Sequence, residues 1–267
     1  MGICRDDATT YLRGLGYNAV RHPDAALLPL EVLGKQDKTC QQLGQLRDLV
    51  DSSSNEPSVE GPIDSAELSG KSSSSLSLGI GAEILGSFVG AMGGKLGADT
   101  SYTNAKKMTF VFADVTKKRV APAQAGAFMT AGDLSTSNPV LVPWVLGKGQ
   151  IYLITEVAYS TSFAIRYERS NGQAATVEVP ALGELAGLNV KVETKSNQSN
   201  VVTFHGKKPL AFAFKCFEIG YLDGKLAFSN LEPGAVALSD VLDSAGEPIE
   251  PGVCLAGVDD VQLIDLR

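Results

Sequence analysis

The side chains best suited to nucleophilic or metal chemistry are four cysteines and two histidines: Cys4, Cys40, Cys216, Cys254, His22 and His205. No cysteine pair has C-x-x-C spacing and no histidine pair lies close by, so the pattern indicates neither a zinc site nor a redox motif. Cys216 and His205 could act as nucleophile and base, but no family-like signature surrounds them. We therefore predict no enzyme, no metal site, and reduced, mostly buried thiols; the Cys216–His205 pair is the enzymatic alternative.

Cys4 lies in a run, Met-Gly-Ile-Cys-Arg, that looks like the glycine-cysteine start of dually acylated proteins. Asp6 occupies the position where N-myristoylation requires serine or threonine, which argues against myristate. Cys4 is a candidate for S-palmitoylation, the alternative being an unmodified surface cysteine. Because no apolar signal region follows Met1, we expect the protein to be cytoplasmic.

Charge is unevenly distributed along the 267 residues, whose formal net charge is −7. Residues 1–231 hold equal numbers of acidic and basic side chains, so the whole excess of −7 lies in residues 232–267. An acidic chain of this kind is not typical of nucleic-acid binders. An acidic terminal segment on a neutral body indicates a tail with a separate role, or serves only solubility.

The tail has two parts of different composition. Residues 232–250 are rich in proline, glycine and acids, which is typical of an exposed, cleavable linker. Residues 251–267 carry enough apolar side chains to dock on the body: Val253, Leu255, Val258, Val261, Leu263, Ile264 and Leu266. A tethered, docked segment of this kind could be a removable latch.

Strand patterns dominate residues 1–231. Alternation from Ile151 to Glu168 is longer than the roughly 9 to 11 residues that a tilted membrane strand needs. Asn171-Gly172 predicts a hairpin, with residues 174–179 as the partner strand. Shorter strands are predicted at 17–20, 108–113, 188–192, 201–204, 210–217 and 222–228. Residues 27–33 are a further possible strand, which Pro29 confines to a sheet edge or an irregular stretch. Short helices are predicted at 6–13 and, from Leu43, Leu46, Leu49 and Val50, at 39–50. Together these elements predict a mostly antiparallel sheet.

The segment from 70 to 98 changes its period midway. Leu76, Leu78 and Ile80 alternate as in a strand, whereas the following apolar residues have helical spacing: Ile84, Leu85, Phe88, Val89 and Met92. Four glycines weaken any such helix, and the uncharged run is too short to span a bilayer. The segment is a candidate for refolding; the alternative is a small-residue helix packed closely on a sheet.

Basic residues flank the predicted strand 108–113, with Lys106 and Lys107 before it and Lys117, Lys118 and Arg119 after it. Such clusters could bind anionic lipid headgroups, or could be solvated strand ends.

The start MGICRDDATTYLRGLGYNAVRHP, the apolar segment from Ile84 to Lys95, the strand TFVFADVTKKR and the short acidic tail together resemble the bacterial gasdermins, over essentially the whole chain. The resemblance implies an α+β fold, with a twisted, mostly antiparallel sheet and peripheral helices, held inactive by a short C-terminal peptide. It implies removal of that peptide by a caspase-like or other protease encoded nearby. It further implies large β-barrel pores that kill phage-infected cells, and a palmitoyl group on Cys4, with no other cofactor.

These implications define our predicted sites. The domains are a pore-forming body (1–231), a linker (232–250) and an inhibitory peptide (251–267). Predicted membrane-inserting residues are Leu76, Leu78, Ile80, Ile84, Leu85, Phe88, Val89, Met92, Phe110, Phe112, Val157, Tyr159, Phe163, Ile165, Val177, Val179, Leu182, Leu185, Leu188 and Val190. Predicted lipid-contacting bases are Lys95, Lys106, Lys107, Lys117, Lys118 and Arg119. Candidate cleavage positions are Leu238, Asp240, Leu242 and Asp243.

The predicted partners are the protease, membrane lipids and further copies of the chain, but not nucleic acid. The protein is expected to be a cytoplasmic monomer before cleavage and an oligomer in the cell membrane afterwards. The alternative function is a lipidated peripheral membrane-binding module that forms no pore.

Overall fold

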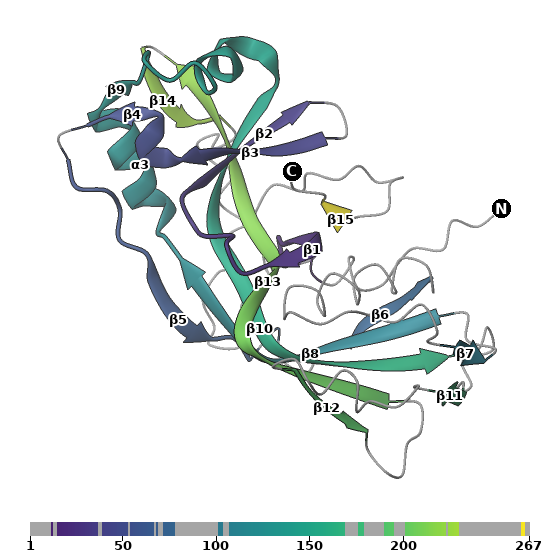
Figure 1. Ribbon diagram of the computed structural model, residues 1–267. Coiled ribbons are helices and arrows are strands. Elements are labelled where there is room, and N and C mark those ends of the chain that lie inside the picture. Colours follow the sequence, from purple (N-terminus) through teal and green to yellow (C-terminus); the bar gives the residue numbers. More distant parts are fainter. Residues whose placement is uncertain are drawn as a thin grey trace.

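The computed structural model describes residues 12, 15–36, 39–52, 54–66, 68, 72–77, 101–103, 107–168, 176–178, 190–194, 201–222, 224–229 and 263–264. Two long antiparallel strands, β10 (Gln150–Glu168) and β13 (Val201–Leu222), run through the whole fold and curve along their length (Figure 1). Several of the other strands pair with different stretches of these two. An α+β fold with a mostly antiparallel sheet is thus confirmed.

The main sheet has 11 strands, and its longest path follows the order β15-β1-β13-β10-β2-β3. The strands on this path besides β10 and β13 are β1 (Asn18–Asp24), β2 (Glu31–Gln36), β3 (Thr39–Gln45) and β15 (Leu263–Ile264). Off the path, β12 (Val190–Thr194) and β14 (Lys225–Phe228) pair with β13. β8 (Lys107–Arg119) pairs with β10, β5 (Glu60–Asp64) and β6 (Ser72–Ser77).

Smaller elements complete the described chain. β4 (Val50–Asp51) pairs with β9 (Asp133–Leu134), and β7 (Ser101–Thr103) pairs with β11 (Thr176–Glu178). The helical elements are η1 (Leu46–Asp48), α3 (Pro122–Ala131) and η2 (Trp144–Lys148), and α3 lies beside β14. No helix in these described ranges has both the length and the apolar character needed to cross a bilayer.

β10 and β13 change neighbours partway along. β10 pairs with β2 at 150–153 and with β8 from Glu156 onward. β13 pairs with β14 at 219–222, with β1 at 211–214, and with β12 at 202–206. From here on, the body means residues 150–160 of β10, 210–222 of β13 and 114–119 of β8, together with β1, β2, β3, β14, α3 and residues 138–148. We call 162–168 of β10, 201–206 of β13 and 107–113 of β8, with β6 and β12, the arm.

β8, β10 and β13 are all irregular where they lie side by side at Asp114, residues 160–162 and residues 205–210, and we call this region the junction. The β10–β13 register shifts between Ser160, opposite Leu210, and Ser162, opposite His205, while β8 has a positive φ of 50° at Asp114. Ser160 Oγ lies 2.6 Å from the carbonyl oxygens of Ala113 and Ser162. Because bulges bend and twist a strand, these irregularities explain why the sheet curves between body and arm.

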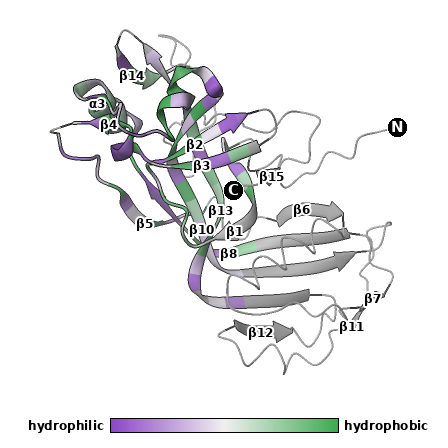
Figure 2. Ribbon diagram, turned by 45° about the horizontal axis from the view of Figure 1, so that its top comes forward, coloured by the Kyte–Doolittle hydropathy of each residue, from purple (hydrophilic) through white to green (hydrophobic). Residues whose placement is uncertain are grey.

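The body has a two-sided core. Every residue of β10 from 151 to 160 is buried, so both faces of the strand are covered. One cluster gathers β2, α3 and η2 residues around Leu46 and Met129, and another gathers Leu33, Phe214 and Cys216. Figure 2 shows hydrophobic residues along the central body strands.

The predicted helix at 39–50 is wrong. Residues 39–45 form β3, which pairs with β2 and carries a positive φ of 133° at Gly44, and only 46–48 form a helical turn. Leu43, Leu46, Leu49 and Val50 are buried as expected. Their helical spacing comes from a strand bulge followed by a 3₁₀ turn, which together bring the same residues to the core.

Other boundaries also differ. The strand predicted at 27–33 begins at Glu31, after Pro29, and lies between β10 and β3, so it is not an edge. The predicted hairpin partner of β10 is wrong: β11 pairs with β7, whereas β10 pairs with β13 and β8. The strands predicted at 201–204 and 210–217 are one strand, β13. Residues 121–132, which lack a clear period, contain α3.

Other expectations are confirmed or lie outside the described residues. β10 and β1 match the strands predicted at 151–168 and 17–20, and β12 covers part of 188–192. The helix predicted at 6–13, the segments 78–100 and 179–189, and the linker lie outside the described residues apart from Leu12.

Candidate functional site

The C-terminal segment reaches the body sheet through β15. Leu263 and Ile264 pair in parallel with Ala19 and Val20 of β1, and the other edge of β1 pairs with β13 (Figure 1). The tail therefore extends the body sheet by one strand. The remaining predicted tail contacts (Val253, Leu255, Val258, Val261 and Leu266) and the four candidate cleavage positions lie outside the described residues.

β1 and the residues before it pack on three strands next to the junction. Leu12, Tyr17 and Ala19 form a buried cluster with strand residues Val115 of β8, Ala158 of β10, and Phe212 and Ala213 of β13. The rings of Phe112 and Phe212 stack beside this cluster, with centroids 3.9 Å apart. The strand that holds the tail therefore also covers the place where β8, β10 and β13 leave the body.

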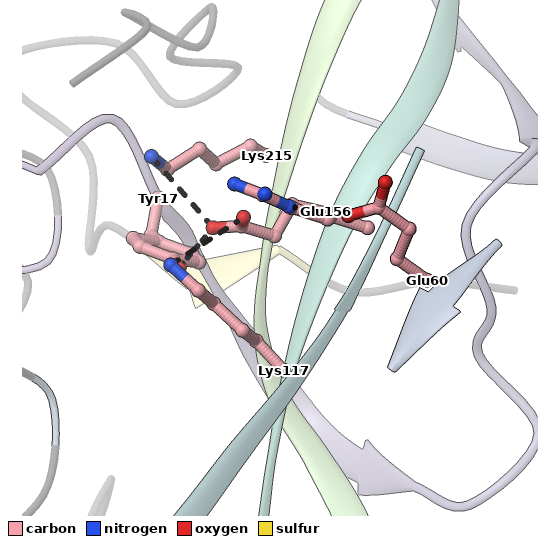
Figure 3. Close-up of polar contacts among 6 residues, drawn as sticks. Tyr17, Glu60, Lys117, Glu156 and Lys215 are labelled. Carbon is pink, nitrogen blue, oxygen red and sulfur yellow. Dashed lines mark hydrogen bonds and ion pairs between the residues drawn. The ribbon is translucent and has the colours of Figure 1, made fainter. Parts of the chain in front are cut away.

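Glu156 is a buried carboxylate on β10, four residues before Ser160 of the junction, with the residue only 8% exposed. Tyr17 Oη donates a hydrogen bond to Glu156 Oε1, and the amino groups of Lys117 and Lys215 lie 3.7 Å from Oε2 and Oε1 (Figure 3). Lys215 Nζ also lies 4.7 Å from the centroid of the Tyr17 ring. We call these four residues the Glu156 network.

The Glu156 network joins four segments at a change of strand partner. The β10–β13 register shifts between Ile154 and Glu156, where β10 passes from β2 to β8. The two lysines come from β8 and β13, and Tyr17 directly precedes β1. Removing one member of a buried charge network typically costs about 3–5 kcal/mol, because the others are left uncompensated.

The ion pair between Arg119 of β8 and Glu60 of β5 provides a contrast one strand away (Figure 3). Its nitrogen–oxygen distance is 3.1 Å, shorter than those in the Glu156 network, yet its side chains are 46% and 52% exposed. Such a pair contributes roughly 0–1 kcal/mol because water screens it. Burial, rather than distance, makes the Glu156 network the stronger constraint.

Four of the predicted membrane-inserting residues fall in two aligned rows of the arm. Phe163 of β10 pairs with Phe112 of β8 and Phe204 of β13, and two positions along, Ile165 pairs with Phe110 and Val202. Since strand residues two apart share a sheet face, the register places these rows on one face.

The other predicted membrane-inserting residues do not share one location. Leu76, Val177 and Val190 lie in β6, β11 and β12. Val157 and Tyr159 lie in the body core, where Tyr159 Oη donates a hydrogen bond to the carbonyl oxygen of Leu27 at 2.6 Å. The others lie outside the described residues: Leu78, Ile80, Ile84, Leu85, Phe88, Val89, Met92, Val179, Leu182, Leu185 and Leu188.

The predicted basic cluster is built into β8 and does not flank it. Lys117 belongs to the Glu156 network, Arg119 pairs with Glu60, and Lys118 Nζ lies 5.5 Å from the centroid of the Tyr159 ring. Lys107 begins β8 opposite Glu168, whereas Lys95 and Lys106 lie outside the described residues. Glu156 and its partners were missed because nothing in their spacing links them. The one available signal is a carboxylate within the apolar run of β10.

The described cysteines and histidines do not form a catalytic pair. Cys40 and Cys216 are buried, as expected, and neither is in a disulfide; burial raises the pKa of the Cys40 thiol despite Lys35. His22 lies in β1 and His205 in β13. Cys216 and His205 lie 11 residues apart in the same strand, β13, a separation of up to roughly 36 Å at about 3.3 Å per residue. Cys4 and Cys254 lie outside the described residues.

Comparison with known proteins agrees with this architecture. The profile of the Bacterial Gasdermin Family matches residues 20–235. A gasdermin bGSDM from Vitiosangium sp. is 37% identical over 268 residues, covering 100% of this chain and 99% of its own length. Another, from a Desulfuromonadales bacterium, is 33% identical and covers 86% of each chain. The structure of a bacterial gasdermin from Bradyrhizobium tropiciagri has the same fold, with a TM-score of 0.56, 17% identity, and coverage of 84% of this chain and 91% of its own. This chain therefore belongs to the bacterial gasdermin family.

Proposed function

We propose that this protein is an autoinhibited pore former that is activated when a protease removes its C-terminal segment. Membership of the gasdermin family supports a pore-forming role in cell death. The observation that carries the autoinhibition is the pairing of β15 with β1, because it attaches the chain's C-terminal segment to the sheet beside the junction.

The linker explains how a strand as short as β15 can stay bound to β1. In the described part of the tail, β15 has two registered pairs with β1, and two pairs by themselves are too few for strong binding by a free peptide. A short linker raises the effective concentration of its own tail to about the millimolar range, and this advantage is lost when the linker is cut. Cleavage anywhere in 232–250 would therefore release β15 without any change in its contacts. The part of the −7 charge of residues 232–267 that lies after the cut would leave with it.

The Glu156 network connects the tail indirectly to β8, β10 and β13. β15 holds β1, Tyr17 precedes β1, and Tyr17 donates its hydroxyl hydrogen to the carboxylate that also holds β8 and β13. Losing the tail would loosen β1 and, with it, the residues that cover the junction.

The arm supplies the strands for insertion. β8, β10 and β13 are already paired in antiparallel register, so their shared backbone hydrogen bonds could persist in lipid. Because open sheet edges are not tolerated in a bilayer, many copies must close into one β-barrel. We place the inactive protein in the cytoplasm, the pore in the cell membrane, and the activity in antiphage defence triggered by a caspase-like or other protease.

Dye release tests the proposal. A protease site placed between residues 232 and 250 should make the protein release dye from vesicles only after cutting. Excess synthetic peptide 251–267 should slow release, whereas the same peptide with Ile264→Pro should act more weakly, since proline lacks the N–H for pairing. A cut protein that binds vesicles but releases nothing would instead indicate the lipidated peripheral module.

We propose palmitoylation of Cys4 as a second element, which would help to hold the closed state and later to anchor the open one. Intact protein from the native host should carry about 238 Da of added mass, the value for one palmitoyl group. Cys4→Ala should remove that mass and weaken killing, and Cys254→Ala is the matched control that should do neither. An unshifted wild-type mass would refute this element alone.

A further inference from the structure

We propose that a body loop, residues 138–148, is a membrane-contacting surface separate from the arm, and that its partner is the surface of an anionic lipid bilayer. The proposal rests on the proposed function only in that the activated protein must reach a membrane. It assigns lipid contact to a part of the chain that is not expected to insert.

The loop has two apolar faces, and only one of them is packed. Leu141 and Trp144 are buried against the body, while Val140 is 53% exposed and Leu146 is 73% exposed, with exposed Pro143 between them. Val140, Pro143 and Leu146 are all exposed while Leu141 and Trp144 are buried, so the exposed apolar residues lie on the side of the segment that is turned away from the body. A helical segment on a protein surface normally has polar residues on its outer face.

The loop is held in place, so its exposed face has a fixed position. Asn138 Oδ1 accepts hydrogen bonds from the N–H groups of Val140 and Leu141, at 3.0 and 3.2 Å. Trp144 lies so close to Gly34 of β2 that a Cβ there would be 2.8 Å from the indole ring. Gly147, with a φ of 102°, turns the chain directly after Leu146.

Charge favours a lipid partner over a protein partner. Residues 134–155 contain no acidic side chain, and Lys148 Nζ lies 4.7 Å from the centroid of the Trp144 ring. Lys35 lies on β2 opposite Gln150, beside the end of the loop. Exposed aliphatic residues beside lysines and without acids are typical of segments that bind anionic bilayers, whereas the cores of protein interfaces are depleted in lysine.

The fold allows this contact during insertion. The loop leads directly into β10, whose other end lies in the arm, and the sheet curves between the two (Figure 1). A body that turns away from an inserted arm can lie along the bilayer surface and rest its loop on the lipid.

Trp144 provides the test, because it is the only tryptophan in the chain. The cleaved protein is mixed with vesicles of mixed phosphatidylcholine and phosphatidylglycerol, with or without brominated acyl chains. We expect the brominated lipid to quench Trp144 fluorescence. We expect Val140→Ser with Leu146→Ser to weaken vesicle affinity about tenfold, from the loss of apolar contact. The matched control is Val59→Ser with Leu28→Ser, which alters residues that are 42% and 39% exposed elsewhere, and it should keep the affinity.

The outcomes separate this inference from the proposed function. Dye release without Trp144 quenching would overturn the lipid contact and leave the pore standing. Unchanged vesicle affinity with impaired assembly in the Val140/Leu146 variant would assign the face to a second copy of the chain, and would also overturn it. Absence of both binding and release in the cleaved wild-type protein would refute both.

Discussion

The body and the arm use the same two strands in different ways. In the body, β10 is buried along both faces by packed side chains, whereas in the arm its described partners are the strands on its two edges, β8 and β13. Side-chain contacts on the faces of a sheet are lost when the neighbouring layers move away. Hydrogen bonds between neighbouring strands are kept when the sheet moves as a unit. One strand therefore joins a core that is packed on both faces to a segment whose described contacts are strand pairings.

Breaking the tail contact should have the largest effect, because it removes the constraint on the junction. Deleting residues 245–267 should stop growth when the chain is expressed without any protease. Colony counts measure the effect, with protein levels confirmed by immunoblot. Normal growth at confirmed expression would contradict a closed state held by the tail.

Two phenylalanines test whether body residues mainly determine stability and arm residues mainly determine membrane insertion. Phe214→Ala should lower the free energy of unfolding by about 3–5 kcal/mol, because Phe214 is fully buried in the body. Phe163→Lys, in the arm, should cost less stability but should abolish dye release by the cleaved protein, since lysine on a lipid-facing strand costs roughly 2–4 kcal/mol at the bilayer centre. Urea unfolding and vesicle leakage measure the two, and the reverse pattern would refute the division.

The Glu156 network should matter more than its exposed neighbour. Glu156→Gln removes the buried carboxylate charge that Lys117 and Lys215 share and should lower the free energy of unfolding by about 3 kcal/mol. Glu60→Gln, the matched control on the exposed pair with Arg119, should cost less than about 1 kcal/mol. Equal losses in urea unfolding would show that burial does not distinguish the two.

The smallest effect concerns Cys40 in the body core. Its raised thiol pKa keeps it protonated when folded, so alkylation should be slow in native protein and fast after unfolding, in a variant with the other three cysteines replaced. The unfolded thiol ionises first as pH rises, so the stability due to this group is lost as pH rises past the ordinary thiol pKa. A Cys40→Ser variant should lack that slight pH dependence, and equal alkylation rates in both states would contradict burial.

Some of the site was predictable because its signals are local. Alternation predicts β10, and charge and composition separate residues 232–267 from the rest, because both depend only on neighbours in sequence. Failures occurred where a bulge or a turn changed the period, as at Gly44 in β3. Lys117 and Arg119 resemble a free basic cluster in sequence, yet they pair with carboxylates on β10 and β5.

A sheet of long alternating strands and an acidic tail with apolar residues could be predicted from the sequence, because periodicity and charge are properties of consecutive residues. The contacts of Glu156 with Tyr17, Lys117 and Lys215, and the pairing of Leu263 and Ile264 with β1, are seen only in the tertiary structure. These contacts join residues far apart in sequence. Which of them form depends on strand register and on which edges are left unpaired, and both are set only when the whole sheet assembles.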